Sequence, residues 1–329
     1  MPEEWISYAA LKRLGADELR RRIDESPAEA ARWVEAAALN GLWNAQIAWG
    51  QMQIDGHGVA RNPPAGLRWF EIAARAGNAD GTNMVGRCFE LGWGVAVDKV
   101  EAARHYRAAA ERGHAWAQFN LATLLLNGEG VPADRAQALH WYVRSARRGN
   151  AKAMTMIGRY LEHGWGRPAR LRSARRWYRR GAEGGDFRGQ FDHGRHLAEA
   201  GHTQQAVVWL GCAVEGGVPL FCRQVAQGLR NHDLPAMQAL ARRALERACA
   251  TGEAADARAF AVALTEGLGG PPDPEAARRW FARARTIEAA PADAAAPAPA
   301  GRAPQRRPGR IARCAAVLRR TLFALPYGR

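Results

Sequence analysis

The feature that most constrains this chain is a 36-residue period in its glycines. One set keeps this spacing at Gly41, Gly77, Gly113, Gly149 and Gly185. A second set keeps it at Gly56, Gly92, Gly128 and Gly164. Aromatic residues follow in register, at Phe70, Tyr106, Tyr142 and Tyr178. Because chance does not keep three sets in register, the pattern predicts repeated structural units that stack on their neighbours.

Each unit is predicted to hold two helices joined by a glycine turn. Apolar residues at helical spacing, such as Leu121, Leu124 and Leu125, precede the turn, and a second apolar run follows it. The turns read GHGV, GWGV, GEGV and GWGR. Their first glycine supplies the left-handed residue that ends a helix. The sequence therefore predicts an all-α fold, a right-handed α-solenoid of helix–turn–helix repeats in which Tyr106 and Tyr142 are core residues.

The second helix of each unit is predicted to begin at a capping residue. Six residues after the first turn glycine the sequence has Asn62, Asp98, Asp134 and Arg170, and Ser26 lies one period earlier. Asn, Asp and Ser side chains accept hydrogen bonds from the first N–H groups of a helix. A Glu or Gln three residues after Ser26, Asp98 and Asp134 predicts a capping box at these three helices. Arg170 breaks the pattern.

One stretch shows the complete pattern: AQFNLATLLLNGEGVPADRAQALHWYVRSARRGNAKA, residues 117–153. It resembles the Sel1-like repeat, a relative of the tetratricopeptide repeat. We assign residues 26–217 to regular repeats, 218–288 to degenerate and final repeats of the same solenoid, and 1–25 to an N-terminal capping helix. The resemblance implies a non-enzymatic scaffold or adaptor without a cofactor. The implied partner is another protein or peptide, bound in the concave groove.

Comparison of the units with one another suggests where a partner binds. In the first helix of each unit some positions stay apolar, whereas others change their chemistry from unit to unit. The variable positions are four and seven residues apart, so they share one helix face. The resemblance places this helix on the concave side. We expect the partner to contact five residues of this stripe: Trp116, Lys152, Arg159, Arg188 and Arg195. The alternative is a solvated face that varies freely.

The chain is strongly basic, with a formal net charge of +15. One cluster spreads around the predicted helix that follows Arg170: Arg172, Arg175, Arg176, Arg179 and Arg180. Arginines of this density suit phosphate or carboxylate groups, which makes an RNA or anion binder an alternative function. The absence of a recognisable nucleic-acid module makes nucleic acid the less favoured partner. A general arginine-rich composition would also explain the cluster.

The C-terminal part has a different composition. Residues 289–310 form a Pro/Ala/Arg-rich linker, and 311–329 form a basic amphipathic segment. Residues 302–329 contain eight arginines and no acid. Such a segment can lie weakly on an anionic membrane or polyanion, dock into a partner, fold back on the last repeat or stay disordered. A peripheral membrane-associated factor is therefore the other alternative.

Nothing in the sequence indicates catalysis. His193 and His196 lie three residues apart, with His202 and Asp192 nearby, but the two histidines align with core positions of other repeats. The five cysteines are irregularly spaced, so neither a zinc site nor a disulfide framework is indicated. We predict no catalytic, metal or cofactor residues. Without a recognisable signal peptide or membrane span, we expect a cytoplasmic protein, with peripheral attachment at the inner face of the membrane as the alternative.

Overall fold

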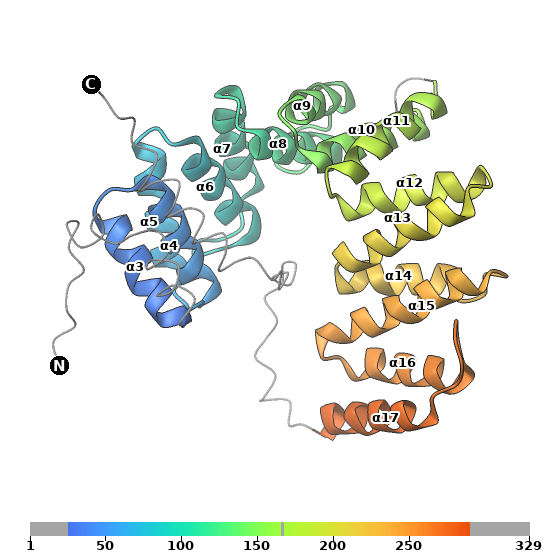
Figure 1. Ribbon diagram of the computed structural model, residues 1–329. Helices are drawn as coiled ribbons and strands as arrows, with labels where there is room; N and C mark the ends of the chain where they lie inside the picture. Colours follow the sequence, from blue (N-terminus) through green and yellow to red (C-terminus); the bar gives the residue numbers. More distant parts are fainter. Residues whose placement is uncertain (1–25, 166–167, 290–329) are drawn as a thin grey trace, which may run out of the picture. The chain divides into compact units, whose positions relative to one another are not determined.

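The computed structural model describes residues 26–165 and 168–289, and these residues fold entirely into helices and connecting turns. Within these ranges there are fifteen α-helices, one short 3₁₀-helix and no strand. Consecutive helices pack in pairs, as Figure 1 shows. The predicted all-α solenoid of paired helices is confirmed.

The chain divides into two compact units, and the boundary between Trp141 and Tyr142 lies inside one helix, α9. The described helices of unit 1 are α3 (Pro27–Leu39), α4 (Trp43–Asp55), α5 (Pro63–Arg75), α6 (Ala79–Leu91), α7 (Lys99–Glu111), α8 (Ala115–Asn127) and the first half of α9 (Arg135–Arg147).

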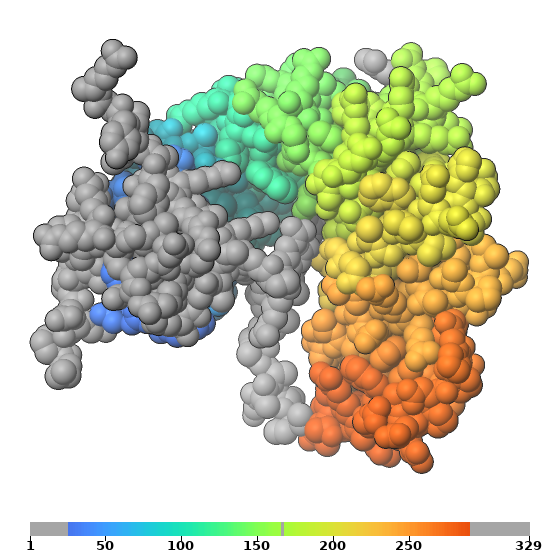
Figure 2. Space-filling model, in the orientation of Figure 1, coloured from blue at the N-terminus to red at the C-terminus, as the bar shows by residue number. Residues whose placement is uncertain are grey.

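Unit 2 begins with the second half of α9. The helices that follow are α10 (Ala151–His163), α11 (Leu171–Glu183), α12 (Phe187–Glu199), α13 (Thr203–Gly216), α14 (Pro219–Leu229), α15 (Pro235–Ala248), η1 (Cys249–Thr251), α16 (Ala254–Glu266) and α17 (Pro274–Ala289). Successive segments of this unit occupy successive layers in the space-filling view of Figure 2. Residues 218–288, which we assigned to degenerate and final repeats, form the pairs α14–α15 and α16–α17.

The two helices of a pair meet where a glycine on the first faces a ring on the second. A Cβ atom added at Gly50 would lie 2.7 Å from the ring of Phe70, and one added at Gly86 would lie 2.8 Å from Tyr106. Gly158 is related to Tyr178 in the same way, at 2.6 Å. The aromatic period is therefore matched by a separate column of small residues at Gly50, Gly86 and Gly158, and both reflect the close approach of the paired helices.

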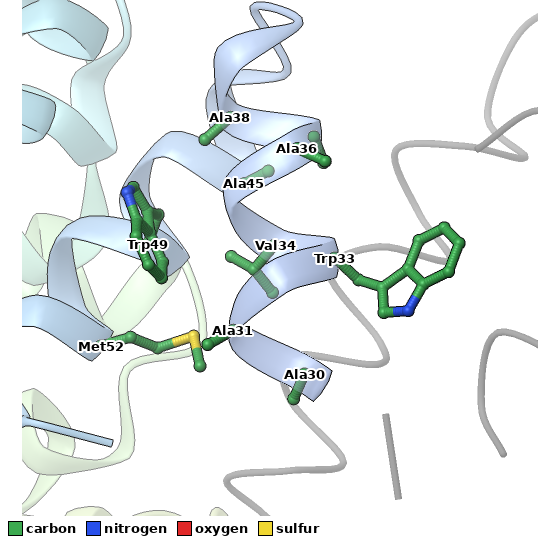
Figure 3. Packing of buried hydrophobic residues seen from close by; sticks show 10 residues of the cluster. Ala30, Ala31, Trp33, Val34, Ala36, Ala38, Ala45, Trp49 and Met52 are labelled. Carbon is green, nitrogen blue, oxygen red and sulfur yellow. The ribbon is translucent and has the colours of Figure 1, made fainter. Parts of the chain in front are cut away.

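The contact between α3 and α4 shows how the core is built from small residues. Figure 3 shows Val34 and Ala31 of α3 facing α4, where Trp49 and Met52 complete the cluster. Trp33 points away from α4 in the same view. Alanine dominates the buried positions of α3, so the helices approach closely, and the larger Trp49 fills the remaining space.

The two glycines of each turn have different roles. The first, as in Gly56, Gly92, Gly128 and Gly164, ends its helix with a left-handed backbone at φ between 63° and 71°. The second, at Gly58, Gly94 and Gly130, is also left-handed and lies against the helix start of the preceding repeat. A Cβ atom added at Gly94 would lie 2.5 Å from the carbonyl oxygen of Pro63. The turn thus connects two helices and packs against a third.

The predicted capping side chains form their hydrogen bonds, but the second hydrogen bond of a capping box, to the backbone N–H of the capping residue, is replaced by another. Asp98 accepts hydrogen bonds from the N–H groups of Val100 and Glu101, and Asp134 accepts them from the corresponding residues of α9. In a capping box the backbone N–H of the capping residue would donate to the Glu or Gln three residues later. Here the backbone N–H of Asp98 donates instead to the carbonyl of Phe89 in the preceding helix, at 2.9 Å. We call this bond the cap stitch. It recurs from Asn62, Asp134, Arg170 and Asp273 to Gln53, Leu125, Leu161 and Leu264.

The predicted capping helix at 1–25, the linker from residue 290 onward and the basic segment at 311–329 lie outside the described residues. In the part of the chain that is described, the helices are too short or too polar to cross a membrane.

Candidate interaction site

The structure brings together two of the five predicted stripe residues. Arg159 lies on α10 and Arg195 on α12, and these helices are in contact within unit 2. Lys152 and Arg188 lie one to two turns earlier on the same two helices. Trp116 belongs to unit 1, on α8, where its side chain is 48% exposed and its ring meets Phe119 edge to face.

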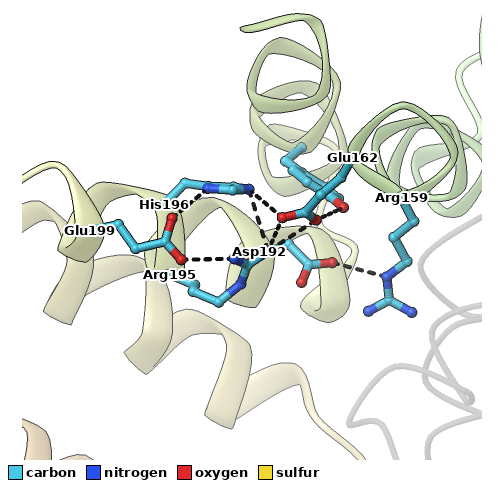
Figure 4. A network of polar contacts seen from close by, with 7 residues as sticks. Arg159, Glu162, Asp192, Arg195, His196 and Glu199 are labelled. Carbon is cyan, nitrogen blue, oxygen red and sulfur yellow. Dashed lines mark hydrogen bonds and ion pairs between the residues drawn. The ribbon is translucent and has the colours of Figure 1, made fainter. Parts of the chain in front are cut away.

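Both arginines are held by carboxylates of the neighbouring repeat. Arg159 donates from Nε to Asp192 Oδ2 at 3.1 Å, which joins α10 to α12. Arg195 makes the reverse connection, because its Nη2 donates to both oxygens of Glu162 at 2.8 and 3.0 Å. Its Nη1 also donates to Glu199 on its own helix at 2.8 Å. Figure 4 shows these pairs side by side between the two helices.

Two buried rings complete this network. The hydroxyl of Tyr178, on α11, donates to Glu162 at 2.6 Å. The ring of His196 lies 5.5 Å from the ring of Tyr178, with its two nitrogens 3.3 Å from Glu162 and 2.9 Å from Glu199. Glu162 and Asp192 were not predicted from the sequence as partners of the arginines. Opposite charges 33 residues apart, close to one repeat, were the signal that could have identified them.

The environment shifts the pKa values of the two central carboxyl groups in opposite directions. Burial alone would raise the pKa of Glu162, but the hydrogen bonds from Tyr178 and Arg195 lower it below its ordinary range. Burial raises the pKa of Asp192, and the attraction of Arg159 does not offset this effect. Asp192 makes one hydrogen bond to a guanidinium, whereas Glu162 accepts three from Tyr178 and Arg195.

The network lines an open hollow of about 390 Å³. Its walls are Arg159, Glu162, His163, Trp165, Tyr178, Asp192 and Arg195. The side chain of Arg159 is 33% exposed, and its two Nη groups make no hydrogen bond to any residue that the structure describes. The ring of Trp165 lies against His163 and Tyr160 at one side. The hollow therefore offers a fixed guanidinium and an aromatic ring to a bound group.

The other stripe residues of unit 2 have local contacts. The guanidinium of Arg188 lies 4.7 Å from the centre of the Phe187 ring. The backbone N–H of Lys152 donates to the capping side chain Asn150 at 3.1 Å. Neither Lys152 nor Arg188 lines the hollow.

The arginine cluster of α11 differs from the prediction in its arrangement. The five arginines do not spread around the helix, because Ala174, Tyr178 and Ala182 occupy the buried side. The arginines share the exposed side, within an arc of roughly 140° at 100° per residue: Arg172, Arg175, Arg176, Arg179 and Arg180. As expected from the sequence, Arg170 makes no side-chain cap.

The two histidines of the sequence analysis have separate environments. His193 is half-buried against the ring of Trp209, and burial lowers its pKa. His196 belongs to the network around Glu162. Among the described residues, no three His, Cys, Asp or Glu side chains are grouped closely enough to hold a metal ion. Burial raises the pKa of the Cys88 thiol to about 12 and that of Cys249 to about 11, so both are thiols at neutral pH.

Paired helices, glycine turns and contacts that run from one repeat to the next define a helical repeat protein of the solenoid class. The Sel1 repeat family matches the chain at residues 9–42, 43–78, 79–114, 117–150, 151–186 and 255–285. These segments cover more than half of the sequence, and the chain belongs to the Sel1 repeat family. Proteins of this family generally bind other proteins as non-catalytic scaffolds.

One solved structure shows the same fold, and two others are similar to this chain at lower TM-scores. A Sel1 repeat protein from Oxalobacter formigenes is 22% identical, with a TM-score of 0.59, over 83% of this chain and 99% of that one. A protective antigen of uropathogenic Escherichia coli with an SLR fold is 26% identical, with a TM-score of 0.40, over 84% and 68%. The immunity protein Pa5087 of Pseudomonas aeruginosa is 16% identical, with a TM-score of 0.42, over 64% and 82%. No curated protein matches this chain.

Proposed function

We propose that this chain is a protein-interaction scaffold that binds its partner through the stripe on the first helices of the repeats. The observation that supports this most directly is the hollow at α10 and α12, where Arg159 and Arg195 are held by carboxylates of the neighbouring repeat. A side chain that is already fixed loses little conformational entropy when a partner binds. Arg159 keeps two Nη groups for a carboxylate or carbonyl of the partner.

The test compares proteins captured from native lysate by three forms of the full chain. The stripe variant carries Trp116→Ala, Lys152→Ala and Arg188→Ala, which leaves the ion-pair network intact. The control variant carries Arg104→Ala, Arg107→Ala and Arg112→Ala, which are two exposed positions of α7 and the exposed residue that follows it, all outside the stripe. A partner captured by the unaltered chain and the control, but lost by the stripe variant, is then purified and titrated calorimetrically against each form.

A fourth form tests the hollow itself. Arg159→Leu together with Asp192→Leu removes both members of one ion pair, so no buried charge is left without a partner. We expect this form to keep its helical circular dichroism and to bind the purified partner at least about tenfold more weakly, the loss of one charge-assisted contact. Full binding by both the stripe variant and this form would refute the proposal.

The two alternative functions keep their status as predictions. Membrane attachment depends on residues 311–329, which lie outside the described part of the chain. The RNA or anion alternative depends on the arginines of α11, which have an exposed face in common.

A further inference from the structure

The arginine-rich face of α11 is separate from the stripe and carries an unusual excess of charge. Helix α11 contains five arginines and one acid, Glu183, which pairs with Arg179 at 3.6 Å. Arg172 and Arg175 make no ion pair or hydrogen bond to any described residue. The face is therefore short of negative partners by several charges, and a guanidinium binds carboxylates through paired hydrogen bonds.

An apolar hollow adjoins this face. It measures about 380 Å³ and is bounded by Ala146 and Arg147 of α9, Met154 of α10, and Trp177, Arg180 and Glu183 of α11. Its lining thus includes an alanine, a methionine and a tryptophan, together with two arginines and one acid, Glu183. An apolar hollow beside a face of arginines suits a segment in which an apolar side chain enters the hollow and acidic residues next to it pair with the arginines.

We propose that this surface, which we call the α11 face, is a second docking site that takes an acidic segment of a partner protein with an apolar or aromatic anchor residue in the hollow. A scaffold with two such surfaces can hold two proteins at once, one on the stripe and one on the α11 face.

The ring of Trp177 distinguishes a peptide from a single-stranded nucleic acid. Nucleic acids bind such sites by stacking bases on exposed aromatic faces between basic side chains. The guanidinium of Arg180 already lies over this ring, 5.1 Å from its centre. A base would have to displace Arg180, whereas an apolar side chain can enter beside Met154 and leave that contact intact. The observations therefore favour a protein segment.

The test measures fluorescence anisotropy of labelled probes with the full chain. The probes are the peptide Glu-Glu-Glu-Phe-Glu-Glu-Glu, the same peptide with alanine in place of phenylalanine, and a single-stranded oligothymidylate of equal charge. The face variant carries Arg172→Gln, Arg175→Gln, Arg176→Gln and Arg179→Gln. The matched control loses four charges of the same sign at exposed positions of α7, of its C-cap and of α9, through Arg104→Gln, Arg107→Gln, Arg112→Gln and Arg135→Gln. All forms keep the basic segment at 302–329, so its contribution is the same in each.

We expect the face variant to bind the phenylalanine peptide roughly tenfold more weakly and the control to change by less than about threefold, since each exposed ion pair contributes little. Phenylalanine should improve binding about tenfold over alanine by burial in the hollow, and Met154→Gln should reduce that advantage. Equal losses in the face variant and the control would overturn the proposal. So would equal binding of the two peptides, or tighter binding of the oligothymidylate that the face variant abolishes.

Discussion

At the scale of the residue, the second glycine of a turn, such as Gly94, must adopt a left-handed backbone and also leave room for a neighbouring helix. Gly94 has φ of +75°, and a Cβ atom there would lie 2.5 Å from the carbonyl oxygen of Pro63. Gly77 has φ of +84° but open space around it. A substitution at Gly77 therefore tests backbone strain alone, whereas one at Gly94 tests backbone strain together with steric conflict.

We predict that Gly94→Ala costs clearly more stability than Gly77→Ala. The left-handed backbone costs a non-glycine residue about 1–2 kcal/mol at either position. Gly94→Ala adds a conflict with a backbone atom, for a total of about 2–4 kcal/mol. Urea unfolding followed by circular dichroism measures both values. Equal midpoints for the two variants would mean that the turn does not pack against the preceding helix.

The two central carboxyl groups should respond to pH in opposite ways. Burial raises the pKa of Asp192 above its ordinary 3.8. The folded chain therefore favours the protonated carboxyl, and the contribution of Asp192 to stability falls as the pH rises from the ordinary pKa through the raised one. Hydrogen bonds lower the pKa of Glu162 below its ordinary 4.5, so its contribution is present above that value and is lost as the pH falls. As the pH rises from about 3.5 to 7, the stability of Asp192→Asn relative to the unaltered chain should therefore increase. The relative stability of Glu162→Gln should decrease over the same range.

The free energy of unfolding of both variants, measured in urea at several pH values, checks this expectation. Tyr178→Phe is the companion variant, because it removes one hydrogen bond from Glu162 and should weaken the pH response of that group without abolishing it. Parallel profiles for Asp192→Asn and Glu162→Gln would contradict the opposite shifts.

At the scale of the element, the start of each second helix combines a cap with the cap stitch. The stitch uses backbone atoms only, so it forms at Arg170 as well as at Asp98. The side-chain cap is present at Asp98 and absent at Arg170. Helix α11 therefore has the correct entry into the helix but lacks one acceptor for its first N–H groups.

We predict that Arg170→Asp stabilises the chain by about 1 kcal/mol, since it supplies the missing acceptor and places a negative charge at the helix start. Asp98→Ala should cost about the same amount at α7. Both changes are read as shifts in the urea midpoint at neutral pH. Arg170→Ala is the control for the loss of the arginine itself. If Arg170→Asp is no more stable than Arg170→Ala, the backbone at position 170 does not place a side chain where it can accept hydrogen bonds from the first N–H groups of α11.

At the scale of the whole molecule, periodicity made the helices predictable and left the contacts between repeats unpredicted. The glycine and aromatic periods are local signals, so they located the turns and predicted a core position for Tyr106, whereas the contact of its ring with Gly86 is seen only in the structure. The cap stitch joins backbone atoms, which leave no mark in the side-chain sequence. The pairing of Arg159 with Asp192 depends on how far α10 is displaced along α12, and one sequence does not give that displacement.

The same repeat architecture predicts how mutations combine within unit 2. Helices there contact neighbours along the chain, so energetic coupling should be confined to adjacent repeats. Glu162 contacts Arg195 directly, whereas Arg258 pairs with Glu288 at the far end of the unit. A double-mutant cycle of Glu162→Gln with Arg195→Gln should give a coupling energy of about 0.5–3 kcal/mol. The cycle of Glu162→Gln with Arg258→Gln should be additive within about 0.5 kcal/mol.

Urea unfolding of the single and double variants gives both coupling energies, and a common unfolding slope is the condition for comparing them. The second cycle is the control, since it removes charges of the same signs from the same unit. Coupling of equal size in both cycles would show that charge interactions in unit 2 are long-range. The ion pairs around Arg195 would then not act locally to hold that one side chain in place. Coupling confined to the first cycle would mean that each repeat interface sets the position of its own surface residues. A scaffold built in this way can change the residues at one interface and leave its other binding surface unaltered.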